Sequence, residues 1–218
     1  MGGEHLQCCY REQLAYSLYA RFREPKLFRM AVDGNWDTIP ERCLSHPREA
    51  AFLHKYAPYD TALHRVLRPT ESECSFREDL DDDMKIEIDG IKFAAVRALL
   101  LANPEAASIQ DAFGRTPLHL ACIDSEACCV ASASLIVKSN PQACLILDVE
   151  KRTPLHFLLA RNDTISPEFL ELLVAHGANA VYLKDAVGES AIDIVRRRHD
   201  KIKNSKHVLD ILKRVATS

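Results

Sequence analysis

The sequence predicts an all-α solenoid of about five helix-turn-helix units, with a capping helix at each end. The tetrapeptide Thr-Pro-Leu-His occurs at 116–119 and at 153–156, and a degraded copy begins at Ser190, so successive copies are 37 residues apart. An aspartate stands five residues before each copy, and apolar positions keep the same spacing. Self-similarity at a fixed period of this size is typical of stacked repeats.

A fourth relative of the tetrapeptide, Thr-Ala-Leu-His at 61–64, lies 55 residues before Thr116, which is 18 more than one period. The acidic stretch 68–85 has that length, so its removal restores the period. We therefore expect units that begin near 25, 61, 116, 153 and 190, with an acidic flexible insertion at about 68–90. Residues 1–24 are expected to form a tail and capping helix, and 25–218 the repeat domain.

Two end helices are expected to cover the outer faces of the terminal units. Residues 10–22 read as an amphipathic helix, with Leu14 and Leu18 one turn apart. Residues 205–215 carry four apolar side chains between 208 and 212 and are expected to cap the other end. The terminal units of a repeat stack need polar outer faces for solubility.

Within a unit, each helix has a residue suited to its start or its end. Thr116 suits an N-cap because its hydroxyl can accept a hydrogen bond from a free amide of the first turn. Pro117 suits the first helical position, where a missing N–H has no consequence. A second helix is predicted over 127–139, ending before Pro141, because proline disfavours helix in the preceding residue. A short extended stretch is expected over 143–147.

The turn before each tetrapeptide carries a glycine in two of the three related units. Gly114 and Gly188 stand two residues before the cap, where a turn needs a positive φ. Lys151 occupies the matching position in the fourth unit. This substitution predicts either local strain of about 1 kcal/mol or a different turn.

These patterns resemble ankyrin repeats. The resemblance rests on the segments 114–121, 152–156 and 170–179, is strong over 91–195, and extends weakly across 25–216. It implies that the histidine of the tetrapeptide bonds to the threonine hydroxyl and to neighbouring backbone. The expected structural caps are Thr61, His64, Thr116, Pro117, His119, Thr153, Pro154 and His156.

Composition narrows the class of protein. The chain has 218 residues, 47% hydrophobic residues and a net charge of −3, so no general attraction to nucleic acid or membranes is expected. No run of about 18 apolar residues is present, and no transmembrane helix is expected. Eight cysteines are scattered without the spacing of a secreted disulfide framework, which favours a reducing compartment. We expect a cytoplasmic protein, with the nucleus as an alternative.

No motif predicts catalysis or metal binding. The cysteine pairs at 8–9 and 128–129 are adjacent, whereas zinc ligands are usually separated by two or more residues. His119 and His156 have no partner carboxylate at a fixed offset, and no nucleotide-binding loop, hydrolase or metalloprotease motif occurs. The sequence therefore predicts no enzyme activity, no cofactor and no metal site.

Two charged segments have competing interpretations. Residues 71–89 contain nine acidic and two basic side chains, which is typical of a solvated loop but also suits docking of a basic partner. Arg196–Arg198 and three following lysines form a basic patch, for which a solvated face of the last unit is the preferred interpretation. A nuclear import signal or a nucleic-acid contact remains the alternative.

The resemblance implies a non-enzymatic interaction module that holds a protein partner on its concave face. Two alternatives remain: a nucleic-acid- or chromatin-associated factor that uses the basic patch, and a regulatory subunit of an enzyme on another chain. The protein is expected to be monomeric, with no nucleic-acid partner. The candidate partner-binding residues are Phe113, Arg115, Asp124, Glu150, Arg152, Arg161, Asn162, Val187 and Glu189.

Overall fold

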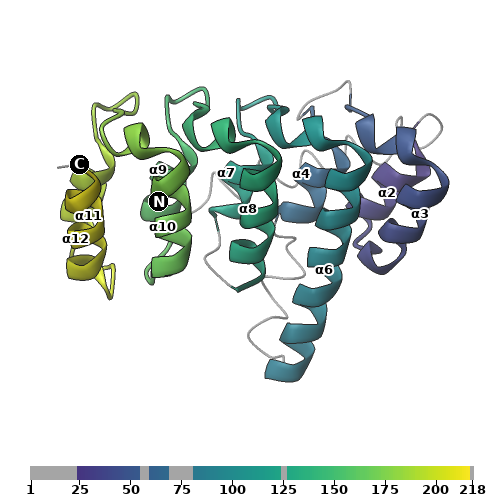
Figure 1. The fold of residues 1–218 in the computed structure, drawn as a ribbon, viewed down its shortest axis with the longest axis horizontal. Helices are drawn as coiled ribbons and strands as arrows, with labels where there is room; N and C mark the ends of the chain where they lie inside the picture. Colours follow the sequence, from purple (N-terminus) through teal and green to yellow (C-terminus); the bar gives the residue numbers. More distant parts are fainter. Residues whose placement is uncertain (1–23, 55–58, 69–80, 124–126, 217–218) are drawn as a thin grey trace, which may run out of the picture.

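The structure, a computed structural model, describes residues 24–54, 59–68, 81–123 and 127–216. Figure 1 shows a single row of helix pairs that runs from α2 (Lys26–Val32) to α12 (Ser205–Ala216). Over these ranges the chain forms no strand, and one isolated β-bridge joins Leu53 to Thr61. The prediction of an all-α solenoid is confirmed. The expected helix at 10–22 lies outside the described residues.

The first helix of each unit starts directly after a position at which the repeat was expected to begin. Pro117 and Pro154 occupy the first turns of their helices, after the N-caps Thr116 and Thr153. Ser190 caps the last of them with its hydroxyl. These first helices are α2, α4 (Ala62–Leu67), α7 (Pro117–Ala121), α9 (Pro154–Arg161) and α11 (Ala191–Arg197).

The second helices pack beside the first ones and carry the repeated apolar positions of the core. Leu99, Ile136 and Leu173, one from each of three successive units, are all buried. Burying a leucine or isoleucine side chain stabilises a fold by about 1.5–3 kcal/mol. The second helices are α3 (Ile39–Ser45), α6 (Asp82–Ala102), α8 (Ala127–Ser139), α10 (Pro167–His176) and α12.

Short 3₁₀ turns follow or precede the second helices. The expected extended stretch at 143–147 is wrong in its first three residues, because they belong to a 3₁₀ turn that begins at Pro141. The side chain of Asn140 starts this turn by accepting from the backbone N–H of Gln142 at 3.1 Å. The turns are η1 (Trp36–Thr38), η2 (Pro47–Ala51), η3 (Pro104–Ser108), η4 (Pro141–Leu145) and η5 (Ala178–Val181).

Helix α6 is the irregular element of the stack. It has 21 residues, and Figure 1 shows its N-terminal half projecting beyond the neighbouring helices. Asp81 caps it, since its carboxylate accepts from the backbone N–H of Met84 at 2.8 Å. The prediction of a flexible insertion over about 68–90 is therefore wrong for 82–90, which is helical, while 69–80 lies outside the described residues.

The turns before the tetrapeptides share one backbone conformation. Gly114 and Gly188 have φ values of 73° and 87°, and Lys151 adopts the same conformation with φ of 60°. The turn at Lys151 is therefore the same as at the two glycines, and its backbone is strained, because residues with a side chain rarely adopt a left-handed conformation. Tyr59, two residues before Thr61, repeats the pattern with φ of 57°.

Candidate functional site

The tetrapeptide histidines hold both the helix starts and the neighbouring unit. The Nδ1 atom of His119 accepts from the backbone N–H of Thr116 at 3.0 Å and contacts the threonine hydroxyl at 2.9 Å. Because Nδ1 accepts, the ring proton sits on Nε2. Nε2 donates to the carbonyl of Arg152, in the next unit, at 3.1 Å. His64 and the Arg115 carbonyl repeat this contact at 3.2 Å.

The last two units depart from this arrangement. His156 caps its helix through Thr153 in the same way, with Nδ1 2.8 Å from the threonine hydroxyl. Its Nε2 atom is buried and has no hydrogen-bond partner among the described residues, although the carbonyls of Glu189 and Leu183 lie near it. In the fifth unit Asp193 replaces the histidine, and its carboxylate accepts from the hydroxyl of Ser190 at 2.6 Å.

Burial keeps these imidazoles neutral. It lowers the pKa of His119 to about 4, against a smaller opposing effect of its bond to the Arg152 carbonyl. Burial also lowers the pKa of His64 and of His156. Removing a charged imidazolium from water is unfavourable, so the neutral form is favoured. These histidines act as fixed structural groups at pH 7.

In each of the last three units, an aspartate builds the loop tip that precedes the tetrapeptide or its degraded copy. Oδ1 of Asp111 accepts from the backbone N–H groups of Phe113 and Arg115, each at 2.9 Å. Asp148 and Asp185 do the same in the next two units. The repeated aspartate thus fixes each tip, and its position five residues before the cap was visible in the sequence.

Backbone hydrogen bonds join successive tips into a row. The N–H of Val149 donates to the carbonyl of Phe113 at 3.0 Å, and the N–H of Ala186 donates to the carbonyl of Glu150 at 2.8 Å. Gln110 adds side-chain bonds to the carbonyls of Gly114 and Leu147. The tips of the third, fourth and fifth units therefore form one continuous rim.

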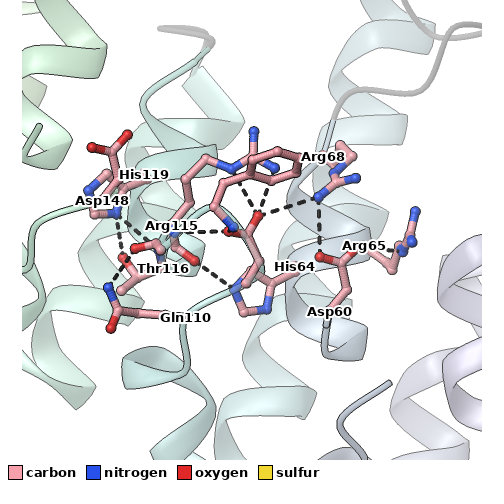
Figure 2. A network of polar contacts seen from close by, with 12 residues as sticks. Asp60, His64, Arg65, Arg68, Gln110, Arg115, Thr116, His119 and Asp148 are labelled. Atoms are coloured by element: carbon pink, nitrogen blue, oxygen red, sulfur yellow. Dashed lines mark hydrogen bonds and ion pairs between the residues drawn. The ribbon is translucent and has the colours of Figure 1, made fainter. Parts of the chain in front are cut away.

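A chain of ion pairs lies beneath the rim and joins the second unit to the third (Figure 2). Asp60 is fully buried and contacts Arg65 at 2.7 Å and Arg68 at 3.2 Å. Arg68 lies 3.6 Å from Asp111, whose carboxylate also binds Arg115 at 2.7 Å. The sequence did not reveal this network, because Asp60 stands where later units carry Arg115 and Arg152.

Several charged residues predicted to bind a partner form ion pairs within the protein. Arg115 is paired with Asp111 and lies with its guanidinium 4.6 Å from the ring centre of Phe113. Arg152 pairs with Asp148 and Glu150. Glu189 is held by two hydrogen bonds from Arg197, at 2.7 and 2.9 Å. These residues support the tips.

Asn162 is buried and is a structural residue, which corrects its assignment as an exposed contact. Its amide donates to the carbonyls of Cys122 and Leu158, at 3.1 and 2.9 Å. Its neighbour Arg161 is exposed. Asp124 lies outside the described residues. The alternation between a buried and an exposed residue at the end of α9 gives no clear sequence signal.

The tips of the third, fourth and fifth units each expose an apolar side chain. Phe113 is 41% exposed, Val149 67% and Val187 84%. The sequence singled out Phe113 and Val187 but missed Val149, which precedes the candidate Glu150 by one residue. Glu150 itself is exposed beside Lys151.

Two arginines of the basic patch, near the end of α11, form intramolecular contacts. Arg197 binds Glu189. Arg198 donates to the carbonyls of Leu159 and Asn162 and pairs with Asp163 at 2.7 Å, so it ties the fifth unit to the fourth. The arginines therefore have a structural role in addition to any role in solubility.

The remaining features of the part of the chain that the structure describes concern metal ligands, cysteines and membrane-spanning helices. That part contains no group of three metal-ligating His, Cys, Asp or Glu residues. Cys43, Cys122 and Cys144 are buried, and burial raises the pKa of the Cys43 and Cys144 thiols to about 11. None of the described helices is long and apolar enough to span a bilayer.

Comparison with known families agrees with this geometry. Residues 88–185 match the family described as ankyrin repeats, in three copies. A search of curated proteins finds no match to the chain. Ankyrin repeats are in general protein–protein interaction modules, and the family is typically non-enzymatic. Residues 88–185 are therefore ankyrin repeats, within a chain whose described residues form an all-α solenoid.

Proposed function

We propose that the protein is a non-enzymatic scaffold that holds a protein partner across the row of tips on its concave face. The observation that carries this proposal is the exposure of Phe113, Val149 and Val187 on three successive tips. Each of these three tips holds an apolar side chain in water, where a partner can bury it. Phe113 is the expected anchor, because aromatic residues dominate the binding energy of protein interfaces.

The rim is suited to this task because its backbone is fixed before binding. Each tip is held by its aspartate, and adjacent tips are bonded to one another. A surface that is ordered in the free protein loses little conformational entropy on association. The charged side chains Glu150 and Lys151 flank the apolar row, and exposed charges at a rim chiefly set the association rate.

The proposal treats residues 25–218 as one repeat domain that acts as a monomer in the cytoplasm. The eight cysteines lack the spacing of a secreted disulfide framework, and this supports a reducing compartment. The internal pairing of Arg197 and Arg198 disfavours the competing use of the basic patch for nucleic acid, because paired guanidinium groups are less available to phosphates.

Quantitative affinity purification with tip variants tests this function. The triple variant Phe113→Ser, Val149→Ser and Val187→Ser should lose a defined set of proteins that the wild type retains. The matched control replaces exposed Lys201, Lys203 and Lys206 with Gln and should keep that set. Loss of the same proteins from the lysine variant alone would contradict the proposal and favour the basic end. The melting temperature of each variant shows whether the fold is intact.

A further inference from the structure

An apolar groove of about 470 Å³ lies between α3 and α6, the second helices of the first two units. Leu44 and Leu101 border it and are 86% and 74% exposed. Large apolar side chains at such exposure are expected to be covered when they line a common groove. The groove involves the second helices rather than the tips, so the inference does not depend on the proposed function.

The exposed face of α6 extends the groove toward the projecting half of the helix. Glu87, Gly90, Ala94 and Leu101 are exposed and follow helical spacing on one face. Gly90 lies in the interior of the helix, where glycine is less favourable than alanine by about 0.5–1 kcal/mol. A Cβ atom added to Gly90 would meet no other atom within 4 Å, so the space beside it is open. A glycine at such a position permits close approach of a second helix.

We propose that this face of α6 and the groove bind the chain's own N-terminal segment, residues 10–22, as an amphipathic helix. The point at which the chain enters the described structure supports this occupant. Glu24 is fixed by a 2.9 Å contact with His54. The backbone N–H of Leu27 donates to Glu49 in η2 at 2.9 Å. Glu24, two residues after this segment in sequence, is therefore held close to η2.

Turn η2 also adjoins the C-terminal end of the groove. Pro47, at its start, lines the groove together with Ala102, at the end of α6. Asn103, the residue after α6, donates to the carbonyl of Ala50 in η2 at 3.4 Å. A helix over 10–22 that ends beside η2 therefore runs parallel to α6 and reaches toward its N-terminal half.

Length and register agree with this placement. A helix of 13 residues is about 20 Å long, and the exposed face from Ile86 to Leu101 spans about 22 Å. Arg11, Leu14, Leu18 and Phe22 follow one another at intervals of three, four and four residues. Shifted by 76 positions, they fall level with Glu87, Gly90, Ala94 and Ala98. The three apolar side chains thus oppose three small residues, and the arginine opposes a carboxylate.

Photo-cross-linking in the full chain tests the proposal. The variant Leu101→p-benzoylphenylalanine, which changes an exposed residue, should cross-link on irradiation to residues 10–22 of the same chain, as identified by mass spectrometry. The variant Val187→p-benzoylphenylalanine, at a tip, should give no such product. Adding Leu14→Glu and Leu18→Glu should reduce the yield from position 101 by at least about fivefold, because both charges would be buried in an apolar groove.

The matched control is Gln13→Glu with Ala20→Glu, on the opposite side of the predicted helix, and it should leave the yield unchanged. An intramolecular product that depends on Leu14 and Leu18 but not on Gln13 and Ala20 supports the proposal. Three results would overturn it: no product with 10–22, equal losses in both double variants, or a product that links two chains and rises with protein concentration.

Discussion

The side chain of His119 bonds to the backbone of Arg152, 33 residues further along the chain and one unit away. Its Nε2 atom donates to the Arg152 carbonyl at 3.1 Å, while Nδ1 accepts from Thr116 within its own unit. His64 and Arg115 form the equivalent pair at 3.2 Å. One imidazole thus closes a helix start and couples two repeats, and it can do both only as the neutral Nε2–H tautomer.

This requirement predicts that the protein is destabilised in mild acid. The buried histidines stay neutral when folded, since burial lowers the pKa of His119 to about 4 and also lowers those of His64 and His156. In the unfolded chain they bind a proton below about pH 6.5. Stability is therefore full above about pH 6.5 and declines as the pH falls. The loss is about 1.4 kcal/mol per pH unit between about pH 6.5 and 4 for His119, and His64 and His156 add losses of the same sign. Urea unfolding at pH 7, 6 and 5 measures this decline.

The variant His119→Gln separates this effect from general acid sensitivity. It should be less stable than the wild type at pH 7, because it alters a buried hydrogen-bonded group. Its loss of unfolding free energy between pH 7 and 5 should be smaller by about 2 kcal/mol, since one titrating group is gone. Identical pH profiles for the two proteins would show that folding does not lower the pKa of His119.

Lys151 offers a stabilising substitution. Its φ of 60° is strained for a side-chain-bearing residue, so Lys151→Gly should raise the unfolding free energy by about 0.5–1 kcal/mol. Gly188→Ala should lower it by a similar amount, because its surroundings are open and only the backbone is strained. Gly114→Ala should be more harmful, as the added Cβ would lie 2.9 Å from the backbone nitrogen of Val149. Thermal unfolding of the three variants ranks their stabilities. A lower melting temperature for Lys151→Gly than for the wild type would contradict the prediction.

Loss of a helix cap should reduce the free energy of unfolding less than loss of a core side chain. Thr116→Ala removes one partner of a reciprocal capping box and should destabilise the protein by about 1 kcal/mol. Leu118→Ala leaves a cavity at a fully buried site and should destabilise it by about 2–5 kcal/mol. Exposed Lys138→Ala serves as the control, with a change below about 0.5 kcal/mol. If Leu118→Ala were tolerated as well as Lys138→Ala in urea unfolding, the assigned packing of α7 would be wrong.

Asn162 and Arg161 form a test pair from adjacent positions. Asn162→Ala removes an amide that donates to two carbonyls, so it should lower the unfolding free energy by about 1–3 kcal/mol. Arg161→Ala, at an exposed site, should change stability little. Asn162→Ala should not remove a direct contact with a partner, because the Asn162 side chain is buried. Equal stability of the two variants in chemical denaturation would indicate that the Asn162 side chain is exposed.

Much of the fold was predictable because the repeat makes local signals agree. A threonine, a proline, an aspartate and a glycine each favour one conformation at a fixed offset, so the first helices and the turns could be placed to within a residue or two. The N-terminal half of α6 was missed because its acidic composition suggested a solvated loop. Yet Asp81 caps that helix, and acidic side chains near a helix N-terminus favour helix.

The site was less predictable, because side-chain pairing depends on neighbouring units. Arg115 and Arg152 looked free in sequence, but each is held by the aspartate four residues before it. Arg68 reaches Asp111, 43 positions away, through packing that no local pattern encodes. Val149 was overlooked because it stands one residue after the tip aspartate, whereas Phe113 and Val187 stand two residues after theirs.

The dissociation rate of a captured protein partner tests the central claim most directly. Surface-immobilised wild type is compared with Phe113→Ala and with Leu44→Ser, which alters an exposed leucine away from the tips. Phe113→Ala should raise the dissociation rate by about tenfold without lowering the melting temperature, because a buried aromatic anchor contributes more than about 1 kcal/mol. Leu44→Ser should leave the rate unchanged. An unchanged rate for Phe113→Ala, with an altered rate for Leu44→Ser, would contradict binding at the tips.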